Sequence, residues 1–154
     1  MKIVRTITIN RSPKEIFDTW RHLEALPGCM THLVSVQVLD HKLSHWISKA
    51  PAGRKIAWDA EITEEEPDHL LAWRSRAGAD VPNSGAIRFV QAPADRGTEL
   101  TVTLDVAPRG GVLGRTVARF FGDGVKQQID EGLRRFKCVM ETGEVPVSSD
   151  ASSQ

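Results

Sequence analysis

Apolar side chains recur at helical spacing through residues 112–142, with charged and amide side chains between them. The apolar positions are Leu113, Val117, Phe120, Phe121, Val125, Ile129, Leu133, Phe136, Val139 and Met140. One apolar stripe and one polar face predict an amphipathic helix of roughly 45 Å at about 1.5 Å per residue. Gly143 follows, where a glycine commonly ends a helix. Because a helix with one apolar face must bury that face, we expect the rest of the chain to supply a surface for it.

The first residues predict a strand followed by a short helix. Residues 2–9 roughly alternate in polarity and are rich in β-branched side chains, which favours a strand. Ser12, Pro13 and Glu15 then fit the N-cap, N1 and N3 positions of a helix that begins with a capping box. We expect this helix to end before Pro27, with a turn or helical fragment leading to the next strand.

The middle of the chain predicts six further strands separated by turns. They are residues 32–40, 43–49, 55–64, 69–77, 84–91 and 98–107. The gaps between them carry glycine, proline, asparagine or aspartate and are too short for crossover helices, so the strands form an antiparallel meander. To cover the long helix this sheet must curl. The pattern therefore predicts an α+β architecture with a helix on one face of a curved antiparallel sheet.

The hairpin of residues 55–77 predicts which face of that sheet is buried. A four-residue loop at 65–68 pairs Glu64 with His69. The same register pairs Ile62 with Leu71, Ala60 with Trp73, Trp58 with Ser75 and Ile56 with Ala77. These residues share one mostly apolar face, which we expect to point towards the long helix.

Charged residues occupy the opposite face of the same hairpin. In the predicted register Asp59 pairs with Arg74, and Glu61 and Arg76 lie close by, so these four side chains are expected to face solvent. In the flipped alternative they would line the interior. Burial would then shift their pKa values and make acid–base chemistry plausible.

Large rings and small side chains alternate on the predicted inner face. The rings are Trp58, Trp73, Phe89 and, from the long helix, Phe120 or Phe121; the small side chains are Ala60, Ser75 and Ala77. Strand 43–49 is ambiguous, because either Trp46 or the set of Leu43, His45 and Ile47 points inward. Rings around small side chains indicate either interdigitated packing or a cavity, and the periodicity alone favours packing.

Composition and charge exclude several classes of function. The 154 residues contain 20 Lys plus Arg and 20 Asp plus Glu, so no net charge attracts nucleic acid or anionic lipid. No apolar run is long enough to span a membrane, and the N-terminal residues lack the pattern of a signal peptide. Cys29 and Cys138 have no metal-type spacing and fit a reducing cytoplasm. We expect one domain over residues 1–144 and a disordered tail over 145–154.

The histidines do not predict a metal site. His41 and His45 fall on a turn and a strand, where their spacing separates them by about 13 Å. No third ligand is suggested, so we predict no metal site. We also expect no cofactor. The residues show no convincing catalytic constellation, so the sequence leaves open whether the protein is an enzyme. His32 follows the turn at Cys29 and is a candidate contact near the mouth of a cavity.

Several stretches of the chain resemble the SRPBCC or START-like superfamily, in particular its polyketide cyclase/dehydrase branch, which also contains the coenzyme-Q-binding proteins. They are SPKEIFDTW (12–20), LPGCM (26–30), WDAEITEEEPDHLLAWRS (58–75), NSG (83–85), GTELTVTLDVAP (97–108) and LRRFKCVMETGE (133–144). The resemblance covers residues 1–144. It implies a helix-grip fold, in which about seven curved strands wrap a long C-terminal helix and a short helical pair follows the first strand. It also implies an apolar cavity, which reverses the preference for packing.

The function that this resemblance implies is the binding of a small hydrophobic or aromatic molecule, such as a lipid, a quinone or a polyketide-like compound. The residues expected to contact it are Trp46, Trp58, Ala60, Trp73, Ser75, Ile87, Phe89, Leu104, Phe121, Val125 and Ile129. Two alternatives stay open. One is a polyketide cyclase or dehydrase, which would need a pair of titratable groups inside the cavity. The other is a protein-interaction module with a filled core.

Overall fold

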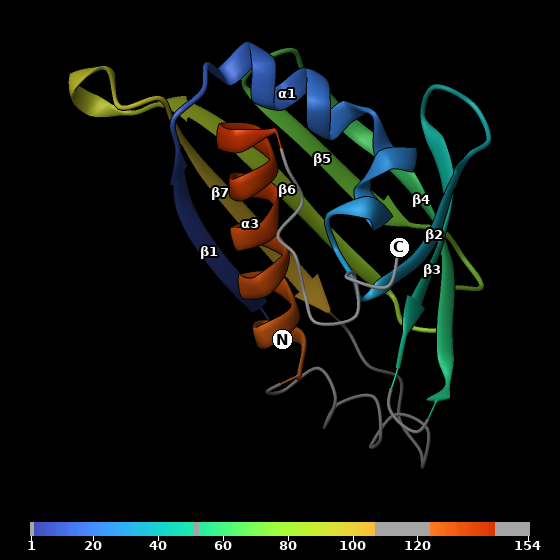
Figure 1. Ribbon diagram of the computed structural model, residues 1–154. Helices are drawn as coiled ribbons and strands as arrows, with labels where there is room; N and C mark the ends of the chain where they lie inside the picture. The colour runs from blue at the N-terminus through green and yellow to red at the C-terminus, as the bar shows by residue number, and fades with distance from the viewer. Residues whose placement is uncertain (1, 51–52, 107–123, 144–154) are drawn as a thin grey trace.

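A computed structural model describes residues 2–50, 53–106 and 124–143 of the chain (Figure 1). The elements are β1 (Lys2–Ile9), α1 (Pro13–Arg21), the 3-10 helix η1 (Leu23–Gly28), β2 (Leu33–Val38), β3 (Leu43–Lys49), β4 (Lys55–Glu66), β5 (Leu70–Ser75), β6 (Asn83–Gln91), the 3-10 helix η3 (Pro93–Asp95), β7 (Thr98–Val106) and α3 (Val125–Thr142). The seven strands form one antiparallel sheet in the order β1-β7-β6-β5-β4-β3-β2.

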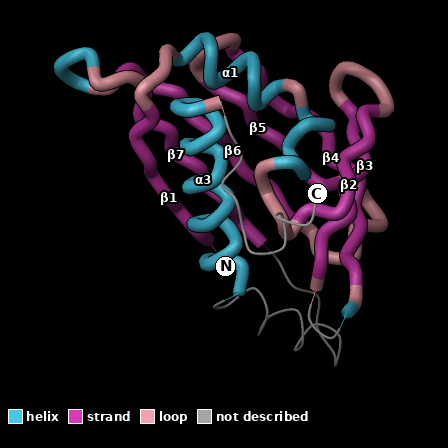
Figure 2. The backbone as a smooth tube through the Cα atoms, in the orientation of Figure 1, coloured by secondary structure: helices cyan, strands magenta, loops and turns pink. Residues whose placement is uncertain are grey.

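The sheet curls, and its concave side faces the helices (Figures 1 and 2). Helix α3 lies in front of the part of the sheet formed by β6, β7 and β1, and it packs against β1. Helix α1 crosses the end of the sheet and packs against β6, and η1 packs against β2. The predicted α+β helix-grip fold, including the short helical pair after the first strand, is therefore confirmed.

The capping box predicted for the first helix is present. The Ser12 hydroxyl accepts a hydrogen bond from the Glu15 backbone N–H at 3.2 Å, and the Ser12 backbone N–H donates to the Glu15 carboxylate at 3.4 Å. Pro13 follows the cap, where its missing N–H costs nothing. The apolar face of α1 then buries Phe17 edge-on against Phe89, with ring centroids 5.3 Å apart.

The long C-terminal helix is described from Val125 to Thr142. Gly143 ends it with a φ of 77°, a left-handed conformation that glycine adopts without steric cost. Phe136 is fully buried and packs edge-on against Trp20 of α1, with ring centroids 4.9 Å apart. The expected beginning of this helix at residues 112–123 and the expected tail at 145–154 lie outside the described residues.

The pairing predicted for the hairpin of β4 and β5 is wrong, although the predicted faces are right. The turn contains only Pro67, Asp68 and His69, because Asp68 takes a left-handed conformation with a φ of 68°. This shorter turn moves the register, and a bulge between Ile62 and Glu64 moves it again. Ile62 therefore pairs with Trp73, Ala60 with Ser75 and Glu61 with Arg74.

The charged face of the sheet points away from the helices. Arg74 meets Glu61 at 3.3 Å instead of Asp59, because the register differs from the predicted one by two residues. Asp59 instead lies 2.6 Å from Nδ1 of His45, its partner on β3. The prediction that these charged side chains lie on the outer face is thus correct, and the flipped alternative does not occur.

Candidate functional site

A cavity of about 180 Å³ lies between the concave face of the sheet and the helices. Its lining comes from α1, η1, the β2–β7 strands and the first turns of α3. Most of the lining is apolar: Leu23, Leu26, Met30, Leu33, Ile56, Ala60, Ile62, Leu71, Val81, Ile87, Leu104, Val106, Val125 and Ile129. Such a void is unusual in an interior that normally packs as densely as an organic crystal.

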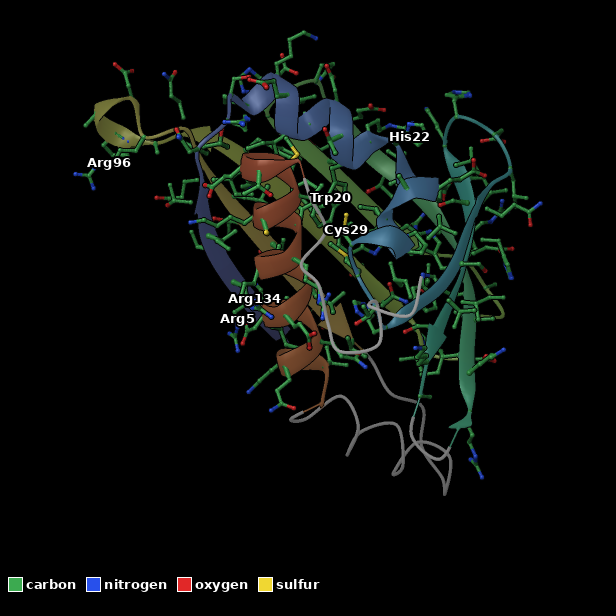
Figure 3. The ribbon with its side chains drawn as sticks, in the orientation of Figure 1. Arg5, Trp20, His22, Cys29, Arg96 and Arg134 are labelled. Atoms are coloured by element: carbon green, nitrogen blue, oxygen red, sulfur yellow. The ribbon has the colours of Figure 1, made fainter. Side chains whose placement is uncertain are left out.

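All four tryptophans of the chain line this cavity. Trp46 and Trp58 are paired neighbours on β3 and β4, and their rings stack with centroids 6.1 Å apart and an interplanar angle of 12°. Trp20 enters from α1, beside α3 (Figure 3). The indole N–H of Trp46 donates to the Ser44 hydroxyl at 2.8 Å, which fixes this ring against the wall. Trp46 is thus the inward residue of the strand whose orientation the sequence left ambiguous.

The position of Trp73 is fixed by residues of the neighbouring strand. Its indole N–H donates to Oδ1 of Asn83 at 3.1 Å. Its ring lies over Gly85, where an added Cβ would come within 2.6 Å of the Trp73 Cη2 atom. Asn83 is held in turn, since its backbone N–H donates to the Ser75 hydroxyl at 2.9 Å and its Nδ2 donates to the Val81 carbonyl at 2.9 Å.

Polar side chains are few in the lining: His32, Ser44, Ser48, Asn83 and Gln128. Burial lowers the pKa of His32 from 6.5 to about 4, against a smaller raising effect from the Glu131 carboxylate. The imidazole is therefore neutral at pH 7 and can both donate and accept a hydrogen bond. Among the residues that the structure describes, His32 is the one acid–base group in the lining.

The structure brings most of the predicted contact residues together at this cavity. Those in the lining are Trp46, Trp58, Ala60, Trp73, Ile87, Leu104, Val125 and Ile129. Ser75 is not part of the lining, because its hydroxyl accepts the Asn83 N–H. Phe89 is also excluded, because it is fully buried beneath Phe17 of α1. Phe121 lies outside the described residues.

Sequence reasoning missed the contribution of the first helical pair. Trp20, Leu23 and Leu26 are buried residues of α1 and η1, and all three line the cavity. Gln128 was missed as well, although a signal existed. It stands three residues after Val125, so helical spacing puts it on the same face of α3 as Val125.

Within residues 2–50, 53–106 and 124–143, no group of three His, Cys, Asp or Glu side chains is arranged to hold a metal ion. The helices of these segments also lack the combination of length and apolar content that crossing a membrane requires. The free thiol of Cys29 is half-buried beside the cavity residue Met30, and burial raises its pKa. A raised pKa disfavours the thiolate that a cysteine nucleophile needs.

Comparison with known proteins places this fold and cavity in a family. The sequence model of the family described as "Polyketide cyclase / dehydrase and lipid transport" matches residues 9–134. An uncharacterized 17.2 kDa protein of Streptomyces lincolnensis is 27% identical over 143 residues, which cover 91% of this chain and 89% of the relative.

Solved structures share the fold of this chain. The crystal structure of DR_A0006 from Deinococcus radiodurans is 38% identical, with a TM-score of 0.74 over 94% of this chain and 100% of that one. The Zhui aromatase/cyclase from Streptomyces sp. R1128 shares the fold at 13% identity, with a TM-score of 0.73 over 95% of this chain and 99% of that one. Because the family model matches most of its length, the chain belongs to the polyketide cyclase/dehydrase and lipid transport family.

Proposed function

We propose that this protein binds a small hydrophobic or aromatic molecule in the cavity between the sheet and α3. The observation that carries the proposal is the cavity itself, about 180 Å³ of space lined mostly by tryptophan and aliphatic side chains. An engineered apolar cavity of about 150 Å³ in another protein binds benzene. A ligand built around a single ring is therefore the size that we expect, and a long-chain lipid or a polycyclic compound would need the walls to move.

Two features of the site support binding over solid packing. The rings of Trp46 and Trp58 stack nearly parallel to each other in the cavity wall, and such an aromatic surface suits contact with a flat apolar molecule. Trp73 is held in place by the Asn83 amide, so its ring cannot collapse into the space without losing a hydrogen bond. A wall that is fixed in this way keeps the cavity open for an occupant.

A cyclase or dehydrase reaction in the same cavity is the second candidate. The observation in its favour is His32, a neutral imidazole that faces the cavity and could accept a proton. The described lining supplies no second titratable side chain to return that proton. Binding without turnover is therefore the function that we place first.

The test is native mass spectrometry of protein purified from its own host, using two variants of one hairpin. Ala60→Leu adds volume at a buried position in the cavity lining, whereas Ala72→Leu makes the same change on the outer face of β5. We expect a bound small molecule in the wild-type protein and in Ala72→Leu, and its loss in Ala60→Leu. Retention of the same molecule by Ala60→Leu at the wild-type level would contradict binding in this cavity.

A further inference from the structure

The polar groups of the cavity wall fall into two sets. Ser44, Ser48 and Asn83 already have partners within the protein: the Ser44 hydroxyl accepts the Trp46 indole N–H, and the Ser48 hydroxyl lies 3.3 Å from the His32 carbonyl. Asn83 uses its oxygen for Trp73 and its Nδ2 for a backbone carbonyl. These three side chains hold the wall together, which engages the Ser44 oxygen, the Ser48 O–H, and the Oδ1 and Nδ2 atoms of Asn83.

His32 and Gln128 form the second set. No described residue makes a hydrogen bond to the imidazole of His32 or to the carboxamide of Gln128, and both side chains line the cavity. None of the described buried polar side-chain atoms is sealed off without a partner, so the polar atoms of these two lining residues are accessible to a small molecule such as water. A polar group that faces an apolar cavity without a partner favours an occupant that supplies one.

Both groups lie where the segment after η1 approaches α3. The side chain of Met30, two residues before His32, packs on α3 at Gly132, where an added Cβ would lie 3.3 Å from Met30 Cγ. Glu131, which precedes Gly132, is close enough to act on the charge of His32. Gln128 lies three residues before Glu131, on the same side of the helix. The two unpartnered groups therefore lie towards the same part of the cavity.

The lining also limits the charge of the ligand. Among the described residues no lysine or arginine lines the cavity, so a carboxylate would enter without a cation to pair with. An unpaired anion in an apolar site loses its hydration and gains little in return. A neutral oxygen loses much less hydration free energy on entering the cavity, and either an imidazole or a carboxamide can donate a hydrogen bond to it.

We propose that His32 and Gln128 together bind one uncharged oxygen of the ligand, a carbonyl or a hydroxyl, and thereby select neutral molecules with a single polar group over hydrocarbons and carboxylates. This inference rests on the proposed function, because it specifies what the same cavity binds. In this arrangement the apolar body of the ligand contacts the tryptophan-rich wall, and its oxygen points to the side of the cavity next to α3.

Three probes of nearly the same shape test this selection. Acetophenone carries a neutral carbonyl, α-methylstyrene replaces that oxygen with a CH₂ group, and benzoate carries a charge. Their affinities for the full-length protein are measured at pH 7.5 by isothermal titration calorimetry. We expect acetophenone to bind about three- to tenfold more tightly than α-methylstyrene, as one net hydrogen bond allows, and benzoate to bind more weakly than both.

Variants then assign the preference to residues. In His32→Phe and in Gln128→Leu the ratio of acetophenone to α-methylstyrene affinity should fall towards one. Gln127→Leu is the matched control, because it makes the same change at an exposed neighbouring position outside the cavity lining and should keep the wild-type ratio. Using two separate positions keeps the test valid if one of the variants fails to fold.

The outcomes separate this inference from the function on which it rests. Equal affinity of the wild-type protein for acetophenone and α-methylstyrene would overturn the polar selection while leaving hydrophobic binding intact. A preference that survives in both variants would show that other groups bind the oxygen. Failure of all three probes to bind would overturn the proposed function together with this inference.

Discussion

At the scale of single residues, His32 is the side chain that most affects the chemistry of the cavity. It is a basic group in an otherwise neutral lining, and burial is the main reason why its pKa falls to about 4. The Glu131 carboxylate works in the opposite direction and Lys49 in the same direction as burial. Around neutral pH the imidazole is therefore a neutral hydrogen-bonding group rather than a cation.

The pKa of His32 predicts how stability depends on pH. Between its unfolded pKa of 6.5 and its folded pKa of about 4, the unfolded state binds more protons. The stability linked to His32 is complete above pH 6.5 and is lost as the pH falls towards 4. From pH 7 to pH 5 we expect a loss of about 2 kcal/mol from this group. Urea unfolding at the two pH values measures it.

Other groups also titrate in this range, so the measurement needs matched variants. His32→Gln should remove the contribution and lose less stability on acidification than the wild-type protein. His22→Gln replaces an exposed histidine nearby in the sequence and should behave as the wild-type protein does. Equal losses in the wild-type protein and in His32→Gln would contradict the assignment of a strongly lowered pKa to His32.

The sequence predicts which residue types meet at the cavity better than it predicts their individual roles. Ser75 was expected to contact the ligand, yet its hydroxyl holds the backbone of Asn83. Phe89 was expected in the lining, yet Phe17 covers it. Alternation along a strand identifies the inward face, but it does not say whether another side chain lies between a residue and the cavity.

At the scale of elements, the β4–β5 hairpin shows why faces are easier to predict than pairs. Its three-residue turn alone would have placed inward residues of one strand opposite outward residues of the other. The extra residue Thr63, at the bulge, corrects this, so that Ile62 and Trp73 share the concave face. The hydrophobic pattern predicts which side chains lie on the concave face, because those are the apolar ones that must be buried. The same pattern contains no information about the turn length or the bulge.

Strands β5, β6 and β7 meet closely at Gly85, which pairs with Trp73 on one side and with Leu104 on the other. A Cβ at this position would collide with the Trp73 ring and with the backbone oxygen of Thr103. We expect Gly85→Ala to lower the free energy of unfolding by about 1–3 kcal/mol, because backbone and a packed ring cannot both move aside. It should also weaken binding, since Trp73 would be pushed into the cavity.

The comparison for this variant is Gly28→Ala, in η1. An added Cβ there meets nothing within 4 Å, and the residue is exposed. Chemical denaturation of both variants gives the two free energies, and near-ultraviolet circular dichroism reports the combined environment of the four tryptophans, Trp73 among them. A Gly85→Ala protein as stable as Gly28→Ala would show that the contact between the ring and Gly85 does not fix Trp73.

At the scale of the whole molecule, the cavity results from the way that the curled sheet and the helices enclose space. The alternation of apolar and polar residues predicted nearly every strand and the inward face of the sheet. The same alternation nevertheless favoured an interior that is filled by side chains. The reason is physical: a pattern of apolar positions does not add up side-chain volumes against the space between a curved sheet and a helix. The cavity was predicted from the family resemblance. Its size and its polar groups are seen only in the structure.

Ligand binding in this cavity is tested most directly by the four indole N–H signals of the ¹⁵N-labelled protein during a titration with toluene. Trp20, Trp46, Trp58 and Trp73 all line the cavity, so each tryptophan reports on it. We predict saturable shifts of these signals in the wild-type protein and in Ala72→Leu, and their absence in Ala60→Leu. Signals that do not move in the wild-type protein, or that move equally in Ala60→Leu, would contradict the account.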